Sequence, residues 1–371
     1  MTAPIAPAPR STRPSGGAPG AISDAARPGA SETLATIAAV RRARRRRVSW
    51  VLAGCLALLL AVGAIALVLG AADVSADRVF LALIGLGDEG DRFVVMRLRV
   101  PRILAAIVCG VAFALAGAVF QAVLRNPLAS PDILGISGGA SLGAVWALLV
   151  LGLGGAAVSG IAFVAALAVA VAIWALAWRQ GLHGIRFVLV GVGFAYVTGS
   201  LVAWLLTRAE VRQAQSALAW TVGSVADVRG DELGWLAAAV AVGCIVVAAL
   251  ARRLGVLALG DDHARGLGVA ADRTRIVLLL VAVALVALAT AAAGPIAFVA
   301  LVAPAIARAL TGGGAALAAS AATGAALTLT ADVIGQYALP GIVAPVGIVT
   351  GVIGAPYLLW LLATTERRRR A

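Results

Sequence analysis

Long apolar runs separated by short polar stretches are the dominant pattern of this chain. Ten runs approach or exceed the roughly 20 residues that a helix needs to cross a bilayer. They fall at 48–70, 103–124, 131–152, 156–178, 185–207, 233–251, 274–293, 295–310, 315–336 and 345–363. The pattern therefore predicts an all-α, polytopic membrane protein with ten transmembrane helices, of which the run at 295–310 is the weakest candidate.

Polar segments flank the apolar region at both ends of the chain. Residues 1–47 are rich in Pro, Ala, Gly and Ser and end in a cluster of arginines, so they predict a disordered cytoplasmic tail. Residues 48–364 should form the membrane domain, followed by a short basic tail at 365–371. The first run is too long for the core of a typical signal peptide, so we expect it to remain as the first transmembrane helix.

The distribution of arginine predicts the orientation in the cell membrane. An even number of crossings places both termini on one side, and that side then also receives most of the arginines that flank the runs. The opposite side receives two longer connections, 71–99 and 208–232, and the second contains a short amphipathic stretch near 214–220. Both termini are therefore expected in the cytoplasm.

Composition narrows the class of protein further. Of 371 residues, 62% are hydrophobic and 13% are charged, and the mean hydropathy is +1.01, which lies far outside the range of soluble domains. The net charge of +13 reflects the arginines beside the runs, so we expect no nucleic-acid partner. The three cysteines lie inside apolar runs without CxxC spacing, which predicts no metal site, and no cofactor is expected.

All 30 basic residues are arginines. A P-loop requires a lysine that contacts the β- and γ-phosphates. This chain therefore has no Walker A site, and any ATP hydrolysis that serves it must occur on another polypeptide.

Glycine and proline are concentrated after the second apolar run. Irregular backbone at membrane depth is tolerated only where protein buries it or where it lines a watery cavity, and glycine also lets helices approach closely. The segment therefore predicts a helix that is broken or closely packed. The residues expected to break it or to allow the close packing are Asn126, Pro127, Pro131, Gly135, Gly138 and Gly139.

A polar segment on the predicted cytoplasmic side, LALGDDHARGLGV at 257–269, combines helix-forming residues with paired carboxylates. Its glycines can end short helical turns. We expect a hairpin that a soluble partner could bind.

Five segments together resemble the FecCD-type permeases, the membrane subunits of ABC importers for ferric siderophores, haem and cobalamin. The resemblance extends over about residues 48–364 and is greatest to the ferric-enterobactin class. The segments are RVPR at 99–102, GAVFQAVLRNPLASPDILGISGGASLGAV from Gly117, the hairpin 257–269, AAAGPIAFVALVAP at 291–304 and PVGIVTGVIGAPYLLWLL at 345–362.

The resemblance implies a type II ABC importer permease fold and a set of partners: an ATPase subunit pair, an extracytoplasmic substrate-binding lipoprotein and a second permease subunit, either a paralogue or another copy, within the lipid bilayer. It implies that the hairpin couples to the ATPase through Gly260, Asp261, Asp262, Ala264, Arg265, Leu267 and Gly268. It implies a translocation path lined by Val192, Tyr196, Gly199, Val346, Thr350 and Ile353.

Two features leave alternatives open. Arg99 and Arg102 match positions that dock the binding protein, but they could equally anchor the outer end of a helix. Asp132 and Asp332 lie near the ends of runs, where a carboxylate can be functional or can cap a helix.

The chain departs from the family pattern at Ala305, where many members have His, at Gln336, where many have Arg, and at Val343, where many have Glu. The last two departures would fit a heterodimer in which a paralogue supplies the missing charges.

The cargo and the energy source also have alternatives. The same importer class could carry haem or cobalamin. A different class, an ion-coupled secondary transporter, would need buried titratable residues, and the ten runs contain almost none away from their ends.

Overall fold

The computed structural model describes residues 30–70, 74–178, 184–228, 230–338 and 341–370, and every regular element within these ranges is a helix. The chain divides into two compact units, Met1–Arg45 and Arg46–Ala371. Residues 1–29, which form most of the predicted disordered tail, lie outside the described residues. The all-α class predicted from the sequence is confirmed.

A helix is present at each of the ten predicted positions. These helices are α1 (Ala30–Val68), α4 (Val100–Val123), α5 (Ile136–Leu149), α6 (Ala156–Ala177), α7 (Gly184–Thr207), α9 (Gly230–Leu257), α11 (Ala271–Ala293), α12 (Val299–Thr311), α13 (Leu317–Tyr337) and α14 (Val346–Arg370). Within the described residues, seven candidate spans are long and apolar enough to cross a membrane. The apolar parts of α5, α12 and α14 are shorter than the other seven.

The first of these helices begins earlier than the sequence pattern predicted. Residues 30–47, which we expected to be disordered, belong to α1. Unlike the preceding segment, residues 30–47 contain no Pro or Gly and are rich in Ala and Arg, which have high helix propensity. The prediction of disorder is therefore wrong for this part of the tail.

Shorter helices occupy the connections. They are α2 (Ala76–Leu83), α3 (Glu89–Arg92), the π-helix η1 (Phe93–Arg99), α8 (Val211–Val222) and α10 (Asp261–Gly266). The helix α8 contains the predicted amphipathic stretch. The hairpin 257–269 has one short helix, α10, because α9 continues to Leu257 and only six residues remain helical before Leu267.

The helix α4 forms the centre of the second unit and packs against α9, α11, α12 and α13. Its glycines allow unusually close approach. A Cβ atom built at Gly117 would lie 1.7 Å from the carbonyl oxygen of Ala300 in α12, and one at Gly110 would lie 2.5 Å from that of Gly324 in α13. Small residues therefore seat α4 directly on the backbones of its neighbours.

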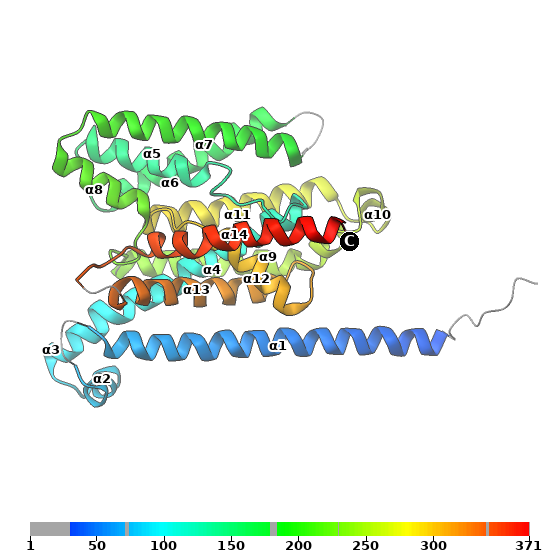
Figure 1. Ribbon diagram of the computed structural model, residues 1–371, viewed down its shortest axis with the longest axis horizontal. Coiled ribbons are helices and arrows are strands. Elements are labelled where there is room, and N and C mark those ends of the chain that lie inside the picture. Colours follow the sequence, from blue (N-terminus) through cyan, green and yellow to red (C-terminus); the bar gives the residue numbers. More distant parts are fainter. Residues whose placement is uncertain (1–29, 71–73, 179–183, 229, 339–340, 371) are drawn as a thin grey trace, which may run out of the picture. The chain divides into compact units, whose positions relative to one another are not determined.

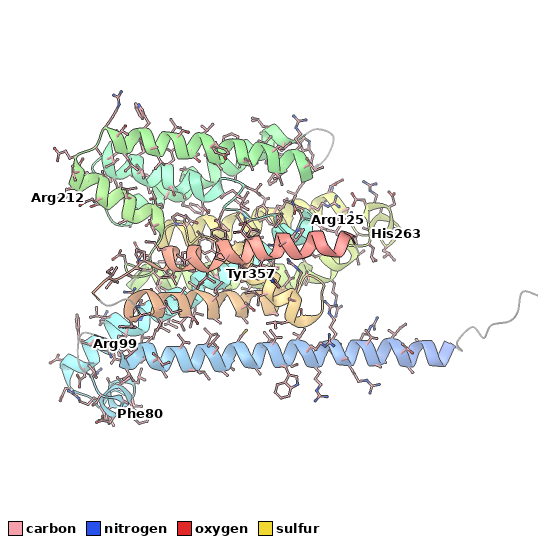
Figure 2. All side chains as sticks on the ribbon, viewed as in Figure 1. Phe80, Arg99, Arg125, Arg212, His263 and Tyr357 are labelled. Atoms are coloured by element: carbon pink, nitrogen blue, oxygen red, sulfur yellow. The ribbon has the colours of Figure 1, made fainter. Side chains whose placement is uncertain are left out.

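The helices α5, α6 and α7 form a second packed group, with α8 next to α5. Within the second unit, α10 and the carboxyl end of α14 lie at one end, whereas α2, α3 and α8 lie at the other (Figure 1). We call these the hairpin end and the opposite end. The hairpin 257–269 therefore lies at one end of the second unit, and Arg99 and Arg102 lie toward the other (Figure 2).

Candidate functional site

The hairpin that joins α9 to α11 is built around α10. Gly260, with φ +108°, precedes α10, and Gly268, with φ +76°, follows it. Both conformations suit glycine and strain other residues. Beneath the hairpin, Leu257, Ala264 and Ala271 form a small buried apolar cluster. The hairpin is therefore a folded element with a core of its own.

One face of the hairpin points away from the protein. The side chains of Asp262 and Arg265 are 98% and 60% exposed and lie 3.5 Å apart. Leu259 and Leu267 are also exposed, and His263 is labelled on this protruding end in Figure 2. Because exposed ion pairs contribute little stability, these charged groups remain able to bind a partner.

The neighbouring carboxylate, Asp261, is directed toward α11 and the end of α4. It accepts hydrogen bonds from Arg275 at the start of α11, at 2.8 and 2.5 Å, and forms an ion pair with Arg125 at 3.1 Å. The hydrogen bond from Arg275, followed by the charges of Arg275 and Arg125, lowers the pKa of Asp261 below its usual range. Asp261 is therefore an anion held between two guanidinium groups.

Arg125 ends α4 in a left-handed conformation, with φ +51°. The amide of Asn126 donates to the carbonyl oxygen of Gln121 at 3.2 Å, the pattern of a helix terminus that usually employs glycine. The Asn126 side chain then accepts a hydrogen bond from the amide of Leu128 at 3.0 Å. Residues 125–135 thus form an ordered break between α4 and α5.

The glycines after this break lie against other helices. Cβ atoms built at Gly135 and Gly138 would approach Ala195 and Thr198 of α7 within 2.7 and 2.6 Å, respectively. One built at Gly139 would lie 2.7 Å from Val169 of α6. Together with Pro127 and Pro131 in the break itself, these residues set α5 closely against α6 and α7.

A separate cluster of polar residues lies at the opposite end. Arg102 of α4 makes two 2.9 Å hydrogen bonds to Asp332 of α13, and Gln336 donates to the same carboxylate at 2.7 Å. Arg99 is buried and donates to the carbonyl oxygens of Leu67 and Val68. Both arginines are engaged within the chain, which favours the anchoring alternative over docking of the binding protein.

The two carboxylates near the ends of runs are not helix caps. Asp332 lies inside α13, and its side chain is 3% exposed. Asp132 precedes Gly135, the N-cap of α5, and accepts a 2.5 Å hydrogen bond from Ser137.

The residues predicted to line a translocation path divide into two groups. Tyr196 and Gly199 on α7 and Ile353 on α14 are exposed, and Val192 is half-buried. Val346 and Thr350 are only 0% and 2% exposed, so both side chains are buried within this chain.

The register of α14 explains this result. The buried Gly354 lies one turn beyond Thr350 and packs against Phe298, at the start of α12. The face that carries Thr350 and Gly354 therefore contacts the protein's own core. The face that carries Ile348, Val352 and Leu359 is exposed.

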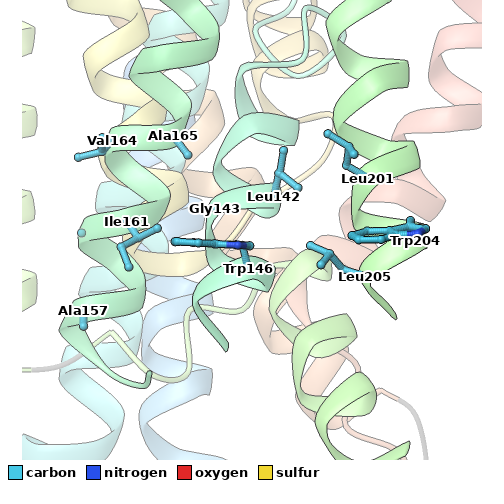
Figure 3. A pocket seen from close by; sticks show the side chains of 11 residues that line it. Leu142, Gly143, Trp146, Ala157, Ile161, Val164, Ala165, Leu201, Trp204 and Leu205 are labelled. Carbon is cyan, nitrogen blue, oxygen red and sulfur yellow. The ribbon is translucent and has the colours of Figure 1, made fainter. Parts of the chain in front are cut away.

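A groove of about 750 Å³ lies among α5, α6 and α7 (Figure 3). Its lining includes Trp146 and Trp204 and contains no charged residue. The groove therefore offers no ionic partner to a charged ligand.

Sequence reasoning missed several polar contacts. Arg125 and Arg275 carry no motif that indicates a shared carboxylate partner. Likewise, Gln121 accepts from Arg308 at 2.5 Å and donates to the carbonyl oxygen of Leu301 at 3.1 Å. The only signal was a polar side chain inside an apolar run, which does not reveal its partner. Among the described residues, no three His, Cys, Asp or Glu side chains form a group that could hold a metal ion.

A comparison with known families matches most of the chain. The profile of the FecCD transport family matches residues 58–364, which include both polar clusters, the break and the hairpin. The chain belongs to the FecCD transport family. It is thus a membrane permease subunit of a transport system.

Individual relatives agree with this assignment. The ferric enterobactin transport system permease protein FepG of Escherichia coli (strain K12) is 38% identical over 301 residues, which cover 81% of this chain and 91% of FepG. The Fe(3+)-citrate import system permease protein YfmE of Bacillus subtilis (strain 168) is 36% identical over 315 residues, or 84% and 94% of the two chains.

A solved structure of a metal-chelate type ABC transporter in an inward-facing conformation shares the fold. It superposes with a TM-score of 0.76 at 25% identity, and the match covers 85% of this chain and 99% of that chain.

Proposed function

We propose that this chain is the membrane-spanning permease subunit of an ATP-driven importer that moves a ferric siderophore into the cytoplasm. The observation that carries the proposal is the family match over residues 58–364, together with 38% identity to a ferric enterobactin permease across most of both chains. The same observation favours an ABC importer over an ion-coupled secondary transporter.

The chain performs no covalent chemistry in this mechanism. An ATPase pair binds the hairpin end and cycles between two states, and the permease follows because the two states of the ATPase bind the hairpin differently. The exposed face of the hairpin supports this role, since Asp262 and Arg265 offer charges and Leu259 and Leu267 offer apolar contacts to one partner surface. The hairpin end, with the carboxyl end of α14, is then cytoplasmic.

A second permease subunit completes the path. The exposed apolar faces of α7 and α14, which include Tyr196 and Val352, are the surfaces that would border this path. The extracytoplasmic substrate-binding lipoprotein delivers the chelate at the opposite end. Because Arg99 and Arg102 are engaged inside the chain, we place the docking surface on exposed groups nearby, such as Arg92 and Arg97.

Uptake by cells tests the cargo. A strain that lacks the chain should lose accumulation of iron supplied as a ferric siderophore and recover it with the wild-type chain, whereas haem and cobalamin uptake should not change. Loss of haem or cobalamin uptake with normal siderophore uptake would contradict the proposed cargo. The ligand that co-purifies with the cognate binding protein provides an independent check.

A further inference from the structure

The side chain of Asp261 connects three separate elements of the protein. Asp261 is the first residue of α10. Its carboxylate binds Arg275 in the first turns of α11 and Arg125 at the end of α4. The apolar cluster under the hairpin joins α9, α10 and α11 but includes no residue of α4. Among the described residues, the ion pair with Arg125 connects the side chains of α10 to the end of α4.

Arg125 is itself held in an unusual conformation. Its φ of +51° is uncommon for a residue with a side chain. Its guanidinium also donates to the carbonyl oxygen of Leu257, at the end of α9, at 2.6 Å. A strained residue persists when surrounding contacts determine its position. The hairpin therefore fixes the first residue of the break between α4 and α5.

The break leads directly to a predicted path helix. It ends at Gly135, whose backbone lies against Ala195 of α7, and Gly138 lies against Thr198 one turn further along α7. Tyr196, between these two contacts, is 75% exposed. A continuous series of close contacts thus connects the hairpin to an exposed face of α7.

We propose that Asp261 is a positioning residue that makes the hairpin, the end of α4 and the break move as one body. When the ATPase displaces α10, the Asp261–Arg125 ion pair transmits the displacement through the break to α7. Asp262, the next residue, has a different role, because it faces the ATPase. This inference rests on the proposed function and assigns a role to a contact inside the permease.

The test uses the complete complex of this chain, its second permease, the ATPase pair and the binding protein in proteoliposomes. Asp261→Asn and Arg125→Gln each remove the ion pair and leave the exposed face of the hairpin intact. We expect the ATPase to co-purify and hydrolyse ATP near the wild-type rate, while chelate imported per ATP falls by about 5-fold or more, the range of a typical coupling free energy.

Conservative and control variants separate coupling from folding. Asp261→Glu keeps the charge and should restore most of the import ratio. The double variant should lower the import ratio by less than the two single effects combined, because both single variants remove the same ion pair. Any further loss would come from the separate contacts of Asp261 with Arg275 and of Arg125 with the carbonyl oxygen of Leu257. Asp272→Asn, which removes an exposed carboxylate from the first turn of α11, should leave the import ratio unchanged.

Two results would overturn the inference. One is a wild-type import ratio in both Asp261→Asn and Arg125→Gln. The other is loss of the ATPase on purification, or a lower melting temperature with an unchanged ratio, because the contact would then be only structural. A wild-type complex that imports no chelate with ATP would instead contradict the proposed function itself.

Discussion

The Arg102–Asp332 pair shows how a single buried contact can dominate local stability. The Asp332 side chain is 3% exposed, whereas that of Arg102 is 23% exposed. Arg102→Ala leaves this carboxylate buried without its guanidinium, which typically costs about 3–5 kcal/mol. We expect a clearly lower melting temperature in detergent. Arg97→Ala, which removes an exposed arginine one turn earlier, should melt like the wild type, and equal melting of both variants would refute this reading.

Gly117 provides a second test at the scale of one residue. A methyl group there would overlap the carbonyl oxygen of Ala300, so Gly117→Ala must displace α12 from α4. Overpacking of this kind typically costs about 1–3 kcal/mol or more. Gly160→Ala in α6 is the matched control, because its added Cβ meets nothing within 4 Å. Thermal unfolding of the two variants should differ, and the account fails if Gly117→Ala is as stable as the control.

The sequence predicted which residue types matter better than it predicted their partners. The carboxylates at 261 and 262 look alike in the sequence, yet one lies between two arginines and the other is almost fully exposed. The family resemblance assigns Val346 and Thr350 to the path, yet both side chains are buried within this chain. Side-chain direction depends on helix register against the core, and the packing of Gly354 on Phe298 sets that register.

At the scale of elements, the hairpin makes the most specific prediction. Asp262→Arg reverses an exposed charge on α10 without touching the buried cluster beneath it. We expect less ATPase to co-purify with the chain and siderophore uptake to fall several-fold, with an unchanged melting temperature. Asp272→Arg reverses an exposed charge on the adjacent helix and should retain the ATPase. Normal ATPase binding by Asp262→Arg would show that the hairpin is not the contact.

Apolar runs located the long helices because the bilayer requires about 20 apolar residues for each crossing. The apolar runs do not define where a helix begins when its first residues lie outside the bilayer. The helix α1 extends back to Ala30 through polar residues, and residues 89–99 before α4 are helical through α3 and η1. Local helix propensity and tertiary contacts, rather than hydropathy, determine those boundaries.

At the scale of the whole molecule, the exposed apolar face of α14 should meet a second permease subunit. After replacement of Cys55, Cys109 and Cys244, Val352→Cys should form a disulfide, on addition of a mild oxidant to membranes, with a cysteine placed at the matching position of the partner permease. Thr350→Cys should not, because Thr350 is buried within the chain. Cross-linking is read as a band of two permease masses on a non-reducing gel. Equal cross-linking at both positions would contradict the observed register of α14.

The source of energy is the central claim, and vesicle uptake tests it most directly. Proteoliposomes that contain this chain, its second permease and the binding protein are compared with and without the ATPase pair, in the presence of ATP and after collapse of all ion gradients. The account predicts that radioactive iron supplied as ferric siderophore enters only with the ATPase and hydrolysable ATP, and that uptake persists without ion gradients. Uptake that occurs without the ATPase and disappears with the gradient would contradict it.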